Sequence, residues 1–201
     1  MSRKTGVTKE TTKRLVLDAG VVYFNIDDSE KRKTLGACRG GSEFVVETEW
    51  RDMPFDGVGG LVKGARRAIS VTCSLTVNLI EITKELLKAA VPGSDFDNGT
   101  TAKDEKGFDV TGEKHYKIKR TVEKALSDFE YTDIAIVAEY ANHKAPIICG
   151  LKNAMANSNL SLTFADAEES VLTITFTGAF DPANIDEEPW FIRIPEMNGV
   201  Q

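Results

Sequence analysis

The stretch EFVVETEWRDMPFDGVGGLVKGARRAISVTCSLTVNL, residues 43–79, decides the fold. Apolar and polar side chains alternate over residues 43–51 and again over residues 69–79. A period of two places successive side chains on opposite faces of a strand, whereas a helix would spread them around its surface. We therefore predict two long strands, each with one face toward a core and one face toward water.

The two faces of these strands differ in chemistry. One face is apolar and is expected in the core, including Trp50 on the first strand and Leu79 on the second. The other face is hydrophilic, although Arg51 interrupts its acidic row. The hydrophilic set consists of Glu43, Glu47, Glu49, Ser70, Thr72, Ser74, Thr76 and Asn78. In an arbitrary protein such a face is most often the solvent side of a β-sandwich, and this alternative stays open.

The segment RDMPFDGVGGLVKG, residues 51–64, joins the two strands. Four glycines and one proline make it too rich in strand breakers for a strand interior, and it is too long for a two-residue turn. We expect it to project from the body of the protein. Its glycines fit neither GxxxxGK[ST] nor GxGxxG, so a flexible turn is favoured over a phosphate-binding loop.

The composition indicates one soluble globular domain. The chain has 201 residues, of which 41% are hydrophobic and 28% charged. A formal net charge of -6 argues against a general nucleic-acid-binding surface, because clustered cations supply phosphate affinity. The polar N-terminus and the lack of a long apolar run favour neither a signal peptide nor a membrane span, so we expect synthesis and assembly in the cytosol.

The rest of the chain predicts an arm, one helix and further strands. Residues 1–14 form a polar arm, and residues 15–201 form a single domain. Residues 81–91 repeat apolar side chains at helical spacing, with Thr83 as a cap. Residues 94–113 are polar and are expected to form a long surface loop, with room for a short hairpin at its end. Further strands are expected over residues 15–25, 115–122, 133–140, 160–164, 171–177 and 190–194, with a kink or a close backbone approach at Gly20. A helical turn is expected at 121–127, a short apolar segment at 146–149 and a small, polar segment at 151–158.

No pattern in the sequence supports catalysis or metal binding. His115 and His143 are the two histidines, and neither stands in a metal-ligand spacing. Cys38, Cys73 and Cys149 are odd in number and widely spaced, which predicts reduced, packed thiols. No GxSxG, CxxC or paired-carboxylate motif is present. We predict that the protein is not an enzyme and holds no cofactor or metal.

A large antiparallel sheet with long open edges suggests self-association. Natural monomers normally blunt such edges, because unpaired backbone groups invite pairing with other chains. A ring that closes through its sheet edges removes them, as a barrel does. The hydrophilic faces would then line a channel.

Several segments resemble the major tail tube proteins of long, non-contractile-tailed bacteriophages. They are AGVVYFN (19–25), LGACRGGSEF (35–44), WRDMPFDGVGGLVKG (50–64), SVTCSLTVNLIEIT (70–83) and PGS (92–94). The resemblance covers residues 15–95 well and the rest loosely. It implies a mainly β (α+β) fold, a two-sheet antiparallel β-sandwich or barrel with one flanking α-helix, related to the tubes of contractile tails and type VI secretion systems. It also implies hexameric rings stacked into a hollow tube for genome delivery.

The resemblance assigns roles to both parts of the 43–79 stretch. The hydrophilic set above corresponds to the lining of the lumen, where acidic and hydroxyl groups would not hold back DNA, which carries one negative charge per roughly 1.7 Å of axis. The 51–64 turn corresponds to a stacking loop, and the arm to a second inter-ring contact. The inter-ring residues are Arg51, Met53, Phe55, Asp56, Val58, Leu61 and Lys63.

The implied partners are further copies of the chain, a tape measure protein, and tail terminator and tip proteins, with double-stranded DNA passing through without specific binding and no membrane involved. The implied location is the virion tail, assembled in the host cytoplasm. One alternative is a β-sandwich binding module that decorates a phage tail or secretion machine, which would require an exposed aromatic cluster. Another is a hydrolase on a β scaffold, which the scarcity of histidines and carboxylate pairs disfavours.

Overall fold

The computed structural model describes residues 6–7, 11–120, 130–157, 160–162, 164, 166 and 169–196. Strands are the main regular elements of this part of the chain, which also contains a 3-10 turn η1 (Thr11–Lys13) and the helix α1 (Lys84–Ala90). The predicted mainly β fold with antiparallel sheets and one flanking helix is confirmed for this part of the chain. The strands are β1 (Val21–Phe24), β2 (Lys33–Thr34), β3 (Cys38–Asp52), β4 (Arg66–Leu79), β5 (Ser94–Phe96), β6 (Thr100–Lys103), β7 (Asp109–His115), β8 (Ile118–Arg120), β9 (Thr132–Ala138), β10 (Ile147–Ala156), β11 (Leu172–Gly178) and β12 (Trp190–Arg193).

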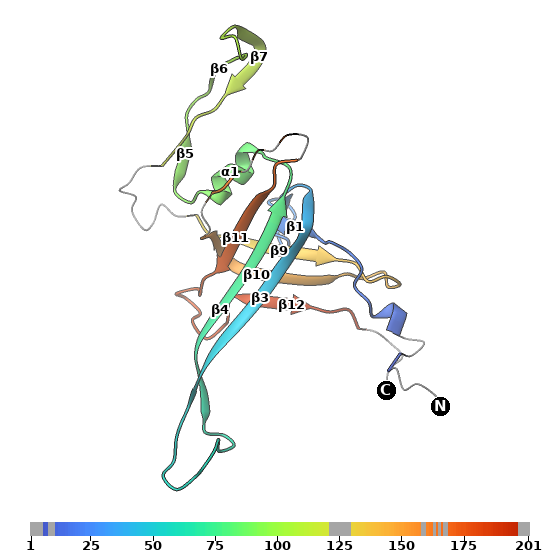
Figure 1. The fold of residues 1–201 in the computed structure, drawn as a ribbon, viewed down its shortest axis with the longest axis vertical. Helices are drawn as coiled ribbons and strands as arrows, with labels where there is room; N and C mark the ends of the chain where they lie inside the picture. The colour runs from blue at the N-terminus through green and yellow to red at the C-terminus, as the bar shows by residue number, and fades with distance from the viewer. Residues whose placement is uncertain are drawn as a thin grey trace.

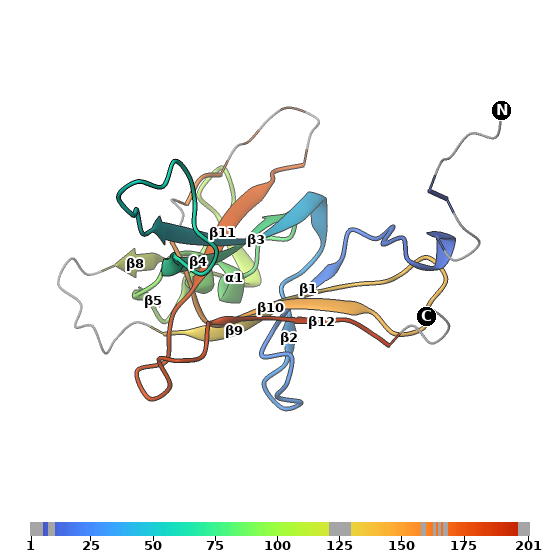
Figure 2. The same ribbon diagram turned by 90° about the horizontal axis from the view of Figure 1, so that it is seen from below.

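The main sheet has the strand order β2-β1-β9-β10-β11-β4-β3, and β12 pairs with β10. Strand β10 belongs to both halves of the sheet. Its first half lies between β9 and β12, whereas its last three residues pair with β11. Figures 1 and 2 show the result, in which β3, β4 and β11 form one layer and cross the layer made by β1, β9, β10 and β12.

The hydrophobic core lies between these two layers. Leu75 and Val77 of β4, Leu151 of β10 and Ile174 of β11 are at most 1% exposed. Full burial of each such side chain stabilises the fold by about 1.5–3 kcal/mol. The apolar face predicted for residues 69–79 is therefore the wall of the core from Cys73 onward.

Helix α1 covers one end of the core, and its start follows the predicted capping. The Thr83 hydroxyl oxygen accepts a hydrogen bond from the Leu86 amide at 3.2 Å. Leu86 and Ala90, four residues apart, are 2% and 4% exposed, because both lie on the stripe that faces the sheet. A helix of seven residues depends on this packing for its stability.

Strand β10 corrects the prediction for residues 146–158. The sequence predicted a short apolar segment and then a small, polar segment, but one strand runs from Ile147 to Ala156. Close packing requires glycine at position 150, since a Cβ added there would lie 2.3 Å from the Phe191 ring. A register shift between Leu151 and Ala154 accompanies the change of partner strand.

The region predicted as a loop over residues 94–113 contains strands β5, β6 and most of β7. They form two small sheets, β5 with β8 and β6 with β7, which together extend as an arm away from the main sheet (Figure 1). The predicted strand over residues 115–122 is divided between the end of β7 and β8. Lys84 of α1 lies over the rings of Phe96 and Tyr116, 5.2 and 4.1 Å from their centroids, and these cation–π contacts hold the base of the arm against the helix.

Near the N-terminus, regular pairing begins at β1 instead of residue 15. Upstream of it, Val16 forms a single bridge with Tyr140. Gly20 has φ +76, and a Cβ there would lie 2.7 Å from the Ile136 side chain, so this close approach requires glycine. The predicted strand over 160–164 is represented by one bridge at Leu162. The predicted helical turn at 121–127 and most of the 1–14 arm lie outside the described residues.

Candidate assembly surface

The hydrophilic side chains predicted on β3 and β4 share one face of the sheet. Glu43 pairs with Thr76, Glu47 with Thr72 and Glu49 with Ser70 across the two strands. Ser74 and Asn78 complete the same alternation on β4. We call this surface the hydrophilic face. The structure thus brings together all eight residues of the predicted set on one surface. Their position in a lumen stays a prediction.

The hydrophilic face continues onto a third strand, β11, which is not part of the predicted set. Thr173, Thr175 and Thr177 of β11 lie opposite Asn78, Thr76 and Ser74. The signal was present in the sequence, because threonine alternates with large apolar residues over 171–177. Only the neighbour relation of β11 and β4, which joins segments far apart in the chain, shows that the three strands form one surface.

Hydrogen bonds between neighbouring strands satisfy many polar groups on this face. The Thr76 and Thr175 hydroxyls lie 3.0 Å apart, and the Thr173 hydroxyl donates to Asn78 Oδ1 at 2.6 Å. Ser70 donates to a Glu49 carboxylate oxygen at 3.0 Å. The carboxylates of Glu43 and Glu47 have no partner in the described part of the chain. The surface therefore presents mutually bonded hydroxyls together with free negative charge.

The β3–β4 pair extends beyond the body as a hairpin (Figure 1). Strand β11 covers β4 only from Ser74 to Leu79, so the remainder of β4 pairs with β3 alone among the described residues. The turn between Asp52 and Arg66 forms the tip. All seven residues of the predicted inter-ring set, which are Arg51, Met53, Phe55, Asp56, Val58, Leu61 and Lys63, lie exposed on this hairpin.

The hairpin exposes many large apolar side chains, which we call the apolar hairpin surface. Their exposed fractions range from 39% to 73%, and exposed apolar side chains gathered in one place mark interaction sites. The set consists of Trp50, Met53, Phe55, Val58, Leu61, Val62 and Ile69.

Trp50 corrects the sequence analysis, which placed it in the core. It is 51% exposed, because the end of β3 that carries it has left the body of the sheet. The Arg66 guanidinium lies 5.5 Å from its ring centroid and pairs with Asp52 at 2.8 Å. Alternation in the sequence shows which face of a strand a residue occupies. It does not show how far along the strand a second layer covers that face.

Strand β3 is the outermost strand of its layer in the described structure. It is 15 residues long, and every second residue directs its backbone N–H and C=O groups away from β4. Such an edge is a template for another strand.

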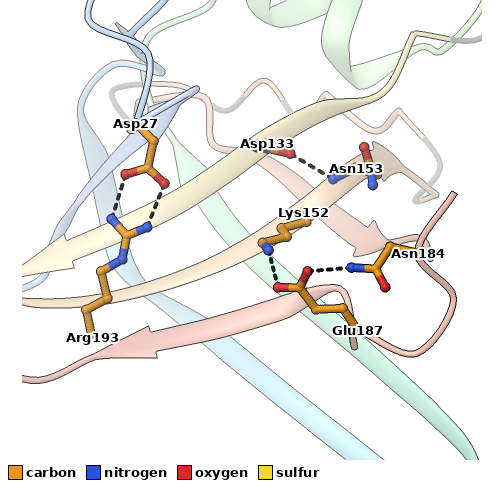
Figure 3. Close-up of polar contacts among 7 residues, drawn as sticks. All are labelled: Asp27, Asp133, Lys152, Asn153, Asn184, Glu187 and Arg193. Atoms are coloured by element: carbon orange, nitrogen blue, oxygen red, sulfur yellow. Dashed lines mark hydrogen bonds and ion pairs between the residues drawn. The ribbon is translucent and has the colours of Figure 1, made fainter. Parts of the chain in front are cut away.

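Ion pairs hold β12 and its neighbours together within the layer of β1, β9 and β10 (Figure 3). Arg193 donates two hydrogen bonds of 2.6 Å to the two oxygens of Asp27, and this contact lowers the pKa of Asp27. Lys152 of β10 pairs with Glu187, which also accepts a hydrogen bond from Asn184. These contacts tie the β1–β2 turn and the segment before β12 to the sheet.

Among the described residues, no group of three or more His, Cys, Asp or Glu side chains is placed to hold a metal ion. Burial raises the pKa of the Cys38, Cys73 and Cys149 thiols, which keeps them protonated at neutral pH. A cavity of about 530 Å³ beside α1 is lined by apolar residues such as Phe24 and Phe176 and by several lysine and glutamate residues. None of the described helices has the length and apolar character needed to cross a membrane.

Comparison with known proteins gives structural matches only. No protein-family model matches the sequence, and no curated protein matches it. A chain of the PVC sheath–tube complex of an extracellular contractile injection system, in its extended state, is similar over 96% of this chain and 99% of that chain, with 12% identity and a TM-score of 0.49. Chains in the tail of an empty gene transfer agent particle and in the native gene transfer agent virion each cover 81% of this chain and 92% of that chain, with 9% identity and TM-scores of 0.44 and 0.43.

Proposed function

We propose that this chain is the structural subunit of a bacteriophage tail tube, which assembles into stacked hexameric rings and forms the channel for genome delivery. The proposal rests on one observation, which is that a single pair of strands combines three features expected of a tube subunit. Strands β3 and β4 hold an open sheet edge, a hydrophilic face and an exposed apolar hairpin surface. The segments that resemble tail tube proteins in sequence include this same pair.

The open edge supports association within a ring. Strand β3 is much longer than the edge strands that natural monomers usually leave free. When a copy of the chain pairs along this edge, each backbone group gains a partner, and a closed ring of copies leaves no free edge. The proposed ring is therefore a continuous sheet of β3–β4–β11 layers from successive subunits.

The hairpin supports association between rings. It extends past the body, so it reaches a neighbour stacked along its own direction (Figure 1). The apolar hairpin surface includes two aromatic side chains, Trp50 and Phe55, which are each about half exposed, at 51% and 52%. Burial of these side chains against a second copy supplies the free energy for stacking, because large aromatics dominate interface energetics.

The hydrophilic face supports a channel for DNA. In the proposed ring it faces the axis, and its groups are carboxylates and bonded hydroxyls. These groups do not attract phosphates, whereas clustered lysines would retain the duplex through counterion release. We propose the virion tail as the location, assembly in the host cytoplasm, and tape measure, terminator and tip proteins as further partners.

Electron microscopy of the purified chain tests this function. Negatively stained samples over a wide concentration range are expected to show hollow tubes or stacked rings at high concentration. Sedimentation velocity on the same samples measures the fraction assembled. A chain that stays monomeric at every concentration contradicts the proposal.

One observation favours a second candidate, a β-sandwich binding module on a tail or secretion machine. Such a module requires exposed aromatics, and Trp50 and Phe55 provide them on the hairpin. The two functions differ in the effect of Trp50→Ala at high concentration. A tube subunit loses assembly, whereas a binding module is monomeric both before and after the change.

A further inference from the structure

Two arginines face each other on the hairpin. Arg51 of β3 and Arg67 of β4 are directly opposite partners, beyond a register shift between Glu49 and Trp50. Like charges directly opposite each other on a strand pair are destabilising. Neither guanidinium has a hydrogen bond or ion pair in the described part of the chain, whereas the adjacent Arg66 is paired with Asp52.

The hairpin and the opposite end of the same layer carry opposite charge. Residues 51–67 contain Arg51, Lys63, Arg66 and Arg67 against Asp52 and Asp56, a difference of four minus two in favour of positive charge. Glu43, near the start of β3, has an unpaired carboxylate on the hydrophilic face. Glu169, which precedes β11, pairs through one carboxylate oxygen with Arg39 at the start of β3, so Arg39, Glu43 and Glu169 together carry one net negative charge.

We propose that Arg51 and Arg67 bind the carboxylates of Glu43 and Glu169 in a second copy of this chain, placed head to tail along the β3–β4 hairpin. This contact rests on the proposed tube function, and it adds the direction in which subunits stack along the tube. Arg51 and Glu43 are eight residues apart on β3, about 27 Å at the usual strand rise. A neighbour displaced along the hairpin by a length of this order brings its acidic end to the basic end of the first copy.

A carboxylate of another copy fits this site better than a DNA phosphate does. Arg51 follows Trp50 on β3 and therefore points to the opposite face of the projecting ribbon, so a neighbour has to pack on both faces to cover the arginines together with the apolar hairpin surface. Guanidinium–carboxylate pairs are strong and directional, and in a partly desolvated contact they set register and exclude wrong orientations. A contact between two different patches repeats without closing and therefore extends a stack in one direction.

Charge exchange tests the contact. One variant carries Arg51→Glu and Arg67→Glu, a second carries Glu43→Arg and Glu169→Arg, and a third carries all four changes. The critical concentration for tube growth is measured by sedimentation, together with the melting temperature of the monomer. We expect each double variant to raise the critical concentration about tenfold or more, a step of about 1.4 kcal/mol. The arginine variant still has two like charges opposite each other, so its monomer melting temperature is expected to stay nearly unchanged. The glutamate variant loses the Arg39–Glu169 pair, so its monomer melting temperature is expected to fall slightly.

The fourfold variant is expected to recover growth to within about threefold of the unchanged chain, since opposite charges again face each other. A matched reversal on the distant β1–β2 turn, Arg32→Glu with Lys33→Glu, is expected to leave growth unchanged. Normal tube growth by both double variants overturns the contact but leaves the tube function standing. A fourfold variant that folds but does not recover tube growth has the same consequence. If the arginine variant grows normally but its tubes retain less duplex DNA, the anion is phosphate and the proposal is wrong. No assembly of the unchanged chain overturns the tube function and this contact together.

Discussion

At the scale of single residues, the close contacts that shape β10 were not visible in the sequence. Gly150 is buried, and the Phe191 ring occupies the space that a side chain would take. A glycine inside a strand pattern indicates a bulge or a close approach, but it does not say which residue approaches. That information depends on the pairing of β10 with β12, segments some forty residues apart.

We predict that Gly150→Ala destabilises the fold by about 1–3 kcal/mol, because the added Cβ would lie 2.3 Å from Phe191. Urea unfolding followed by tryptophan fluorescence measures this change. Gly59→Ala is the matched control, since nothing lies within 4 Å of its added Cβ. Equal stability of both variants would show that β12 moves aside at little cost.

The Asp27–Arg193 pair predicts a pH effect of known sign. Arg193 lowers the pKa of Asp27 in the folded state, so the pair contributes stability above the unfolded pKa of about 3.9 and loses it as the pH falls through the folded value. Both side chains are more than half exposed, which limits the contribution to about 0.2–1 kcal/mol. Asp27→Asn is expected to lower thermal stability at pH 7 but not at pH 2, whereas Asp56→Asn changes neither. A loss of equal size at both pH values contradicts the ion-pair account.

At the scale of elements, alternation and capping in the sequence predicted β3, β4, β11 and α1. These elements combine a regular apolar period with local end signals, so neighbouring residues contain most of the information. The arm of β5–β8 and the start of β1 were harder to predict. They are polar or short, and their positions depend on contacts such as Lys84 with Tyr116, made by residues distant in the chain.

The cap of α1 allows a direct test. Thr83→Ala removes the acceptor for the Leu86 amide and is expected to cost about 0.5–2 kcal/mol in unfolding free energy. Thr83→Ser keeps the hydroxyl and is expected to keep most of this stability. Chemical denaturation of the three proteins side by side distinguishes them. If serine were as harmful as alanine, the methyl group of threonine and not its oxygen would be important.

At the scale of the whole molecule, the proposed function gives the hairpin a role in assembly that is separate from folding. Residues 54–60 make no contribution to the buried core, because they lie at the exposed tip. We predict that their replacement by a short Gly-Ser turn leaves the melting temperature within a few degrees and abolishes long tubes in electron micrographs. Normal tubes from this variant would exclude the hairpin as the contact between rings.

The carboxylates of the hydrophilic face lie at the surface, so a change of their charge is expected to have little effect on folding. The Glu47 and Glu49 side chains are exposed, and reversal of their charge removes only the Ser70 hydrogen bond. In a six-fold ring, Glu47→Lys with Glu49→Lys turns twelve negative groups per ring positive, so the channel attracts phosphates. We expect tubes of normal appearance that retain duplex DNA in 50 mM salt and release it as the salt concentration rises. Glu47→Gln with Glu49→Gln removes the charge without reversing it and is expected to retain little DNA. Equal DNA retention by the lysine variant and the unchanged tubes, at every salt concentration, would place these carboxylates on the outside of the tube.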